Sequence, residues 1–176
     1  MVQTLDIRIA PAARSDAAEL ADVYRRAWSN AYSGIIPSDA LDRLVRSRDT
    51  AAWRTMIADD NVISLRVGDG LAGYATYGRA RPSAARQPPR QPKGPRAEIY
   101  ELYLAPEYQG VGLGEYLFEG CRHRFDERQL RGPDVWVLTD NTVARRFYHA
   151  RGGRLSGRAI HRLGRVQLTK VRYSWD

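Results

Sequence analysis

The sequence predicts an α/β (α+β) domain in which strands and helices alternate along the chain. Short stretches where apolar and polar residues alternate, the pattern of a half-buried strand, recur through the 176 residues. Between them lie segments whose apolar residues are three or four positions apart, as in an amphipathic helix. Glycine and proline separate the two kinds of segment, and no internal repeat interrupts the order. We therefore expect one domain over residues 1–176.

The first half of the chain predicts a strand, three helices and a hairpin. After a strand over residues 6–10, Ser15 or Asp16 can cap a helix that Gly34 and Pro37 end. Its apolar positions are Leu20, Val23, Tyr24, Ala27, Trp28 and Ala31. The elements expected next are helices over 38–46 and 50–58, a strand over 61–67, a Gly-Asp-Gly turn over 68–70, and a strand over 71–78.

The second half predicts four strands and two helices. A Pro-rich loop over 79–96 is followed by a strand over 97–104, a glycine-rich loop and a helix over about 113–128. The remaining elements are a strand over 135–138, a helix over 142–151, and strands over 155–160 and 166–173 joined near Leu163 and Gly164.

Composition excludes several classes of protein. No stretch approaches the roughly 18 apolar residues of a membrane span, and the N-terminal residues lack a signal-peptide pattern, so we expect a cytoplasmic location without membrane partners. The single cysteine, Cys121, excludes an internal disulfide. His123, His149 and His161 are not at ligand-like spacing, so we expect no metal site and an organic cofactor, if any.

The net charge of +8 is concentrated in the Pro-rich loop. Residues 79–96 contain five arginines, one lysine, five prolines and no acid, and the rest of the chain has 22 basic and 20 acidic residues. Such a segment cannot bury much apolar surface, which favours a solvated loop without a dedicated partner. Closure over an anionic ligand and nucleic-acid binding remain alternatives, but no aromatic residue is interleaved with the charges, which weakens the second.

The stretch QGVGLG, residues 109–114, lies where a strand gives way to a helix. The first amides of a helix have no partner within it and favour anions such as phosphate, while glycine allows a close approach to the main chain. A P-loop would need Lys and Ser or Thr after Gly114, and a dinucleotide fingerprint from Gly110 would need glycine at position 115. Glu115 and Tyr116 follow instead, so neither motif is present.

The loop fits a third pattern, Gln/Arg-x-x-Gly-x-Gly/Ala, through Gln109, Gly112 and Gly114. With LYLAPEY before it and DNTVARRFYHARGG after it, the sequence resembles the GNAT superfamily of acetyl-CoA-dependent N-acetyltransferases, bacterial members included. The resemblance is specific over residues 97–153. It implies a single mixed, mostly antiparallel sheet of about six to seven strands flanked by about four helices, with coenzyme A in the cleft after the fourth strand.

The resemblance also implies where acetyl-CoA binds. The pyrophosphate would lie on the main chain of the loop, and the pantetheine arm would pair with the preceding strand at Leu102, Tyr103 and Leu104. The loop residues concerned are Gln109, Gly110, Val111, Gly112, Leu113, Gly114 and Glu115. A glycine-rich start of a helix without any ligand is the alternative.

Two residues after the loop match family positions. Asn141 matches an asparagine that contacts pantetheine, although an asparagine here can equally cap the next helix. Tyr148 matches the tyrosine that protonates the departing thiolate. Phe147, Val143 and Ala144 are apolar neighbours that make ordinary core packing the alternative for Tyr148.

Attack by an amine on a thioester also requires a base, because the amine is protonated at neutral pH. Glu98 lies in an Ala-Glu-Ile segment that matches the base of the histone-acetyltransferase branch, and Glu101 is the second candidate. A route through water is the third, and pairing with an arginine is an alternative for both glutamates. Trp136 stands where other bacterial members carry a glutamate.

The sequence says less about the amine that accepts the acetyl group. AWSNAYSGIIP, residues 27–37, resembles a family segment that shapes the acceptor pocket, so Trp28, Tyr32 and Ile36 are candidate substrate contacts, with core packing as the alternative. No acidic cluster beyond Asp59 and Asp60 would attract a polycation. A neutral or acidic small amine, an amino acid or a protein amino group remains open.

The expected reaction is direct acetyl transfer to a primary amine in a ternary complex. We expect no covalent intermediate on Cys121, because a cysteine within this helix is predicted to be a core residue. A non-catalytic domain that senses acyl-CoA and a nucleic-acid-binding protein are the alternatives. Association of two copies into a homodimer also remains open.

Overall fold

The computed structural model describes residues 6–82 and 94–175 of the chain. These residues form seven strands in one sheet, in the order β1-β2-β3-β4-β5-β7-β6, together with five α-helices. β4 and β5 pair in parallel, whereas the other pairs whose register is defined are antiparallel. The predicted mixed α/β sheet is confirmed, with one helix more than the resemblance implied.

The chain divides into two compact units. The first unit contains residues 1–77 and 101–121, and the second contains residues 78–100 and 122–176.

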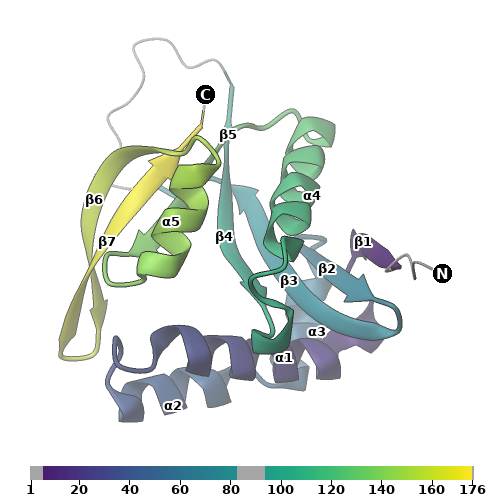
Figure 1. Cartoon of the computed structure of the whole chain (residues 1–176), viewed down its shortest axis with the longest axis horizontal. Coiled ribbons are helices and arrows are strands. Elements are labelled where there is room, and N and C mark those ends of the chain that lie inside the picture. The colour runs from purple at the N-terminus through teal and green to yellow at the C-terminus, as the bar shows by residue number, and fades with distance from the viewer. Residues whose placement is uncertain (1–5, 83–93, 176) are drawn as a thin grey trace. The chain divides into compact units, whose positions relative to one another are not determined.

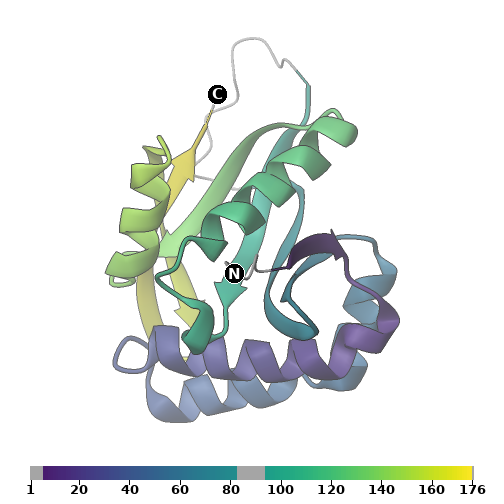
Figure 2. The same cartoon turned by 45° about the vertical axis from the view of Figure 1, so that its right-hand side comes forward.

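The first unit combines an antiparallel part of the sheet with the N-terminal helices. Its elements are β1 (Ile7–Pro11), α1 (Ala17–Tyr32), α2 (Ser38–Ser47), α3 (Thr50–Ala58), β2 (Val62–Val67), most of β3 (Gly70–Arg79), the end of β4 (Arg96–Leu104) and the start of α4 (Leu113–Glu127). α1 and α2 lie side by side in both ribbon views (Figures 1 and 2). Short 3-10 turns over Arg14–Asp16 and Pro106–Tyr108 precede α1 and α4.

Aromatic residues fill the core of the first unit. Tyr24 of α1 contacts Trp53 of α3 with ring centroids 6.1 Å apart, and Trp53 meets Tyr74 of β3 edge-on at 4.8 Å. All three side chains are buried. Leu20 and Val23 join them from α1, as the three- and four-residue spacing of its apolar positions predicted.

The start of α1 differs from the expected cap. Asp16 precedes the helix, but its side chain does not cap α1. Its carboxylate accepts the Ala13 N–H at 2.8 Å and pairs with Arg66 at 2.8 Å. The 3-10 turn occupies the position at which the sequence pattern placed the cap.

The second unit contains the C-terminal strands and one complete helix. Its elements are the beginning of β4, β5 (Arg131–Leu138), α5 (Thr142–Ala150), β6 (Arg154–Leu163) and β7 (Val166–Ser174), together with the end of α4. β6 and β7 form the long hairpin of Figure 1, beside which α5 lies. Tyr148 of α5 contacts Tyr173 of β7 at 6.2 Å between ring centroids, so α5 packs on one face of these strands.

Two boundaries differ from the sequence expectation. β5 begins four residues before the expected residue 135, because Arg131 pairs beside Arg96 of β4 in a parallel register that a local pattern cannot reveal. β3 extends through Arg79 and β4 begins at Arg96, so both ends of the expected 79–96 loop lie in strands. Residues 83–93 of that loop lie outside the described residues. No helix in the described part is long and apolar enough to span a membrane.

Candidate active site

The glycine loop lies in the first unit between β4 and α4. Gly110 and Gly112 have φ of +77° and +88°, a region that disfavours any residue with a Cβ. A Cβ built at either position would meet no atom within 4 Å, so the backbone conformation and not crowding requires glycine. Residues 109–112 are exposed, and α4 begins at Leu113. The loop therefore presents its main chain openly at the start of a fifteen-residue helix.

Gln109 anchors the loop to the strand before it. Its side-chain amide donates to the Leu104 carbonyl at 3.0 Å, and its amide oxygen accepts from Asn30 at 3.5 Å. The side chain of Gln109 thus holds the turn in place.

The end of β4 packs tightly against β3. A Cβ on Gly73 of β3 would lie 2.5 Å from the Leu104 side chain and 2.6 Å from the Tyr103 carbonyl oxygen. The Ala105 N–H donates to the Ala72 carbonyl at 2.9 Å. Glycine at position 73 lets the strand segment Leu102, Tyr103 and Leu104 approach β3 closely.

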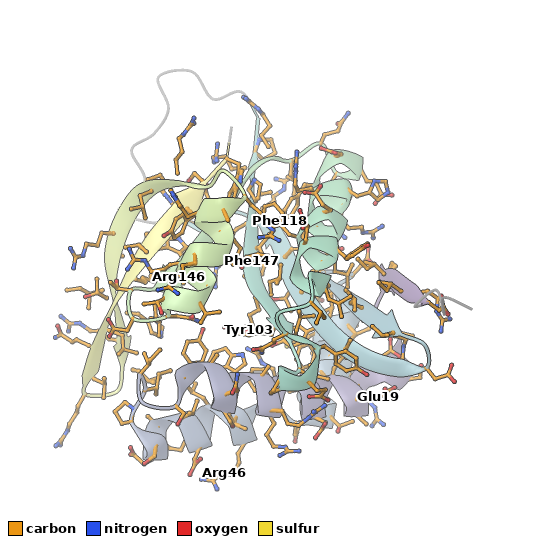
Figure 3. The ribbon with its side chains drawn as sticks, viewed as in Figure 1. Glu19, Arg46, Tyr103, Phe118, Arg146 and Phe147 are labelled. Carbon is orange, nitrogen blue, oxygen red and sulfur yellow. The ribbon has the colours of Figure 1, made fainter. Side chains whose placement is uncertain are left out.

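Tyr103 forms an aromatic group with two of the three candidate acceptor contacts, Trp28 and Tyr32. The Trp28 ring lies 5.7 Å from the Tyr103 ring and 4.9 Å from the Tyr32 ring, and the hydroxyls of Tyr32 and Tyr103 hydrogen-bond. Figure 3 labels Tyr103 near α1. Tyr32 and Ile36 are buried, whereas Trp28 is only partly buried. Burial raises the pKa of Tyr103 well above its ordinary value.

Glu101 is bound by an arginine that the sequence reasoning did not identify. Arg48, at the end of α2, donates to both carboxylate oxygens at 2.6 and 2.5 Å, and the Tyr74 hydroxyl donates at 3.0 Å. The guanidinium lies 4.5 Å from the Tyr24 ring centroid. Burial raises the pKa of Tyr24 to about 12, although the charge of Arg48 opposes the shift. Nothing local in the sequence distinguishes Arg48 from the other arginines.

Glu98, in the second unit, is held in a similar way. Its side chain is 1% exposed, and Arg81 donates to it from the backbone N–H at 2.8 Å and from Nε at 3.0 Å and Nη2 at 2.5 Å. Arg81 lies over the Tyr100 ring, 4.5 Å from the centroid. Arginine pairing, which the sequence left open, is therefore present at both candidate bases.

Asn141 and Tyr148 also lie in the second unit. The Asn141 side chain accepts the Ala144 N–H at 3.1 Å, which is a helix cap for α5. Tyr148 is buried between Tyr173 and Trp175, whose ring centroids lie 6.2 and 6.0 Å away. Phe147, labelled on α5 in Figure 3, contacts Tyr148 edge-on at 5.1 Å.

Trp136 of β5 is flanked by two cations. Lys170 Nζ lies 4.7 Å and Arg172 Cζ 5.5 Å from the centroid of its ring. Sequence reasoning noted Trp136 but missed Lys170, which only strand pairing brings to it.

Cys121 is fully buried in α4, and burial raises the pKa of its thiol. A neutral thiol in a core is a poor nucleophile. Within residues 6–82 and 94–175, no group of three or more His, Cys, Asp or Glu side chains is arranged to hold a metal ion.

Known proteins resemble this chain in sequence or in fold. The chain matches an uncharacterized N-acetyltransferase of Archaeoglobus fulgidus at 41% identity over 51 residues, which are 29% of this chain and 35% of that protein. The match thus spans about a third of that relative. The PaiA N-acetyltransferase of Thermoplasma acidophilum in complex with coenzyme A superposes with a TM-score of 0.75 at 17% identity, over 97% of this chain and 100% of the other.

A second solved structure is the putative acetyltransferase YncA of Salmonella typhimurium with its cofactor acetyl-CoA. Its TM-score is 0.72 at 18% identity, over 97% of this chain and 94% of that one. At these identities both structures establish similarity of fold. The model of the acetyltransferase (GNAT) family matches residues 18–152, most of the chain. The protein therefore belongs to the acetyltransferase (GNAT) family.

Proposed function

We propose that this protein is an N-acetyltransferase that moves an acetyl group from acetyl-CoA to a primary amine of a small molecule or a protein. The observation that carries the proposal is the exposed loop at Gly110 and Gly112, whose positive φ angles present main chain at the start of α4. Such a site suits the pyrophosphate of coenzyme A. The complexes of the Thermoplasma and Salmonella proteins with coenzyme A and acetyl-CoA support the same ligand here.

The proposed reaction is direct transfer. Bound acetyl-CoA supplies an activated thioester: the amine nitrogen forms the new C–N bond, the C–S bond breaks, and the thiolate takes up a proton. We assign that proton to the Tyr148 hydroxyl, following the resemblance. Main-chain groups of Leu102, Tyr103 and Leu104 would hold the pantetheine arm and the acetyl oxygen. Asn141 would add a contact to pantetheine.

The proton of the attacking amine needs a separate path. Glu98 and Glu101 both accept hydrogen bonds from arginine, and Glu98 is 1% exposed against 12% for the Glu101 side chain. A carboxylate engaged in this way has few positions for direct contact with an amine. We therefore propose that water carries the proton away. Glu98→Gln and Glu101→Gln should each keep kcat within about tenfold, whereas a loss of about 10²-fold or more in one of them would identify it as the base.

A thiol-release assay with acetyl-CoA against amines, amino acids and peptides tests the proposal. We expect turnover with at least one acceptor class. Coenzyme A binding without transfer to any amine would instead support a non-catalytic acyl-CoA sensor.

Substitution of Tyr148 tests its role as the acid. Tyr148→Phe should lower kcat by about 10²-fold or more, because a general acid contributes on that order. Tyr173→Phe is the matched control, since it removes a hydroxyl from the ring that packs against Tyr148. Full turnover by Tyr148→Phe would remove that residue from the mechanism.

A further inference from the structure

One face of the second unit gathers cations around an aromatic ring. Trp136 of β5 lies opposite Arg172 of β7, and Lys170 is two residues along the same strand, so the three side chains share a face. Glu98 of β4 lies opposite Asp134, two residues before Trp136, and belongs to that face as well. Tyr173, which alternates with Arg172, contacts α5 on the other face.

Two positive side chains lie over the single ring of Trp136. Arg172 is buried and fixed, because its guanidinium donates to the hydroxyl and the carbonyl of Ser156, both at 2.9 Å. Lys170 is only partly buried, and its ammonium lies 4.7 Å from the ring centroid. The aromatic face attracts the ammonium of Lys170, but it carries no negative charge that would neutralise it.

Within the described residues the side chain of Lys170 forms neither an ion pair nor a hydrogen bond. Glu98 is near enough to act on it electrostatically, but both oxygens of Glu98 accept hydrogen bonds from Arg81. Burial, and then the charge of Arg81, lower the pKa of Lys170, while Glu98 opposes the shift. The surroundings of Lys170 thus favour the arrival of a negative charge.

His161 of β6 is affected by the same positive charge. Burial lowers its pKa, and the positive charge of Lys170 lowers it further. A positive field therefore acts on a second titratable group of this hairpin.

We propose that Lys170, positioned on Trp136, binds an anionic group of the acceptor, so that the natural acceptor is an amine that carries a carboxylate or a phosphate. This inference rests on the proposed acetyltransferase function, and it specifies the acceptor class. Lys170 lies on Trp136, which stands where the resemblance places a glutamate in other bacterial members, and this shared face of the sheet connects the anion site with the acceptor. Polyamines and aminoglycosides, which are polycations, would be repelled by the same charges.

Paired acceptors test the proposal. Acetyl transfer to amino acids is compared with transfer to their primary amides, and transfer to phosphoethanolamine with transfer to ethanolamine. We expect kcat/KM to be at least about tenfold higher for the anionic member of one pair, which also tells whether carboxylate or phosphate is the recognised group. Equal values within both pairs would overturn the inference.

The Lys170→Met variant tests the assigned residue, because methionine retains an unbranched apolar side chain over Trp136. It should raise KM for the preferred anionic acceptor by about tenfold or more, leave kcat nearly unchanged, and leave the neutral acceptor unaffected. Lys170→Arg should keep the preference. Arg162→Met is the matched control, since it removes one positive charge from an exposed position of the same hairpin. A preference unchanged in Lys170→Met would overturn the assignment.

A binding measurement separates failure of this inference from failure of the proposed function. Calorimetric titration with N-acetylglycine, N-acetylglycinamide and N-acetylphosphoethanolamine requires no turnover. An anionic compound that binds the wild type, and binds Lys170→Met about tenfold more weakly, would support the anion site even if no amine were acetylated. Absence of turnover with every amine would contradict the proposed function alone, whereas equal binding by wild type and Lys170→Met would contradict the anion site alone.

Discussion

Arg48 connects the helices of the first unit to β4. Its guanidinium donates to both oxygens of Glu101 and lies over the rings of Tyr24 and Trp53. The side chains of Arg48 and Glu101 are 24% and 12% exposed, so this pair is more shielded from water than the ion pairs on the surface of the helices. Removing one partner of such a pair leaves the other charge poorly solvated.

Arg48→Met should therefore lower the free energy of unfolding by about 1–3 kcal/mol, somewhat less than for a fully buried pair. Urea denaturation measures the change. Arg43→Met is the control, because Arg43 pairs with Asp39 on α2 with both side chains about 70% exposed, and we expect a change below about 0.5 kcal/mol. Equal effects of the two substitutions would contradict the importance of burial.

The lowered pKa of Lys170 predicts how the free energy of unfolding changes with pH. Its folded-state pKa is below the ordinary value of about 10.4, so the unfolded chain binds more protons at pH values between the two. The contribution of this group to stability must then rise with pH in that window. The free energy of unfolding of wild type minus that of Lys170→Met, from urea titrations at several alkaline pH values, should increase with pH. A constant or falling difference would contradict the lowered pKa.

At the scale of elements, α5 begins with a residue that could serve two purposes. Asn141 accepts the Ala144 N–H and so caps the helix, and the resemblance gives it a contact with pantetheine. The cap is observed, whereas the contact remains a prediction.

Two substitutions separate these purposes. Asn141→Ala should cost about 1 kcal/mol in the free energy of unfolding, because the cap is lost, whereas Asn141→Asp should keep it. If the side-chain amide also contacts pantetheine, Asn141→Asp should bind acetyl-CoA several-fold more weakly at unchanged stability. Calorimetry and thermal denaturation measure the two effects, and wild-type affinity in Asn141→Asp would leave Asn141 as a cap only.

Local sequence patterns predicted the helices and strands that have a strong periodic or turn signal. The apolar spacing of α1, together with Gly34 and Pro37 after it, places that helix within a few residues of its observed bounds. The start of β5 could not be predicted, because residues 131–133 join the sheet through pairing with Arg96 of β4 and through a hydrogen bond from Trp175, which follows β7. The extension of β6 through Leu163 likewise depends on β7.

Candidate site residues were predicted less completely than the elements. Motif spacing identified Gly110 and Gly112, whose backbone conformations are observed as expected for a glycine-dependent loop. The partners of Glu98 and Glu101 could not be predicted, because Arg81 and Arg48 lie 17 and 53 residues away in the sequence. With 28 basic residues in the chain, no local signal selects the two that pair.

At the scale of the whole molecule, the division into two units shows that basic and acidic residues are unevenly distributed. Outside residues 79–96 the chain is nearly balanced in sum, but the first unit has 9 basic and 14 acidic residues, while residues 97–100 and 122–176 have 13 and 6. The first unit is built from two separate segments of sequence, so a count along the chain hides this asymmetry. The second unit is strongly basic even without the Pro-rich loop, which agrees with an anionic acceptor.

Ligand binding should raise the free energy of unfolding of the protein. A ligand that binds only the folded state at about 100 times its Kd adds about 2.7 kcal/mol. For a chain of this size that corresponds to a rise in Tm of roughly 5–10 °C. We expect acetyl-CoA to produce such a rise in thermal denaturation.

Two alanine substitutions, each at a glycine with positive φ, test whether this effect depends on the glycine loop. Gly112→Ala places a Cβ on a residue with φ of +88° in the proposed pyrophosphate loop, and Gly164→Ala does so at φ of +59° in the turn between β6 and β7. Both should lower the Tm of the free protein, because left-handed backbone disfavours alanine. Only Gly112→Ala should also reduce the rise caused by acetyl-CoA, since the altered main chain is the proposed ligand contact. An undiminished rise in Gly112→Ala, or an equal reduction in Gly164→Ala, would place the pyrophosphate elsewhere.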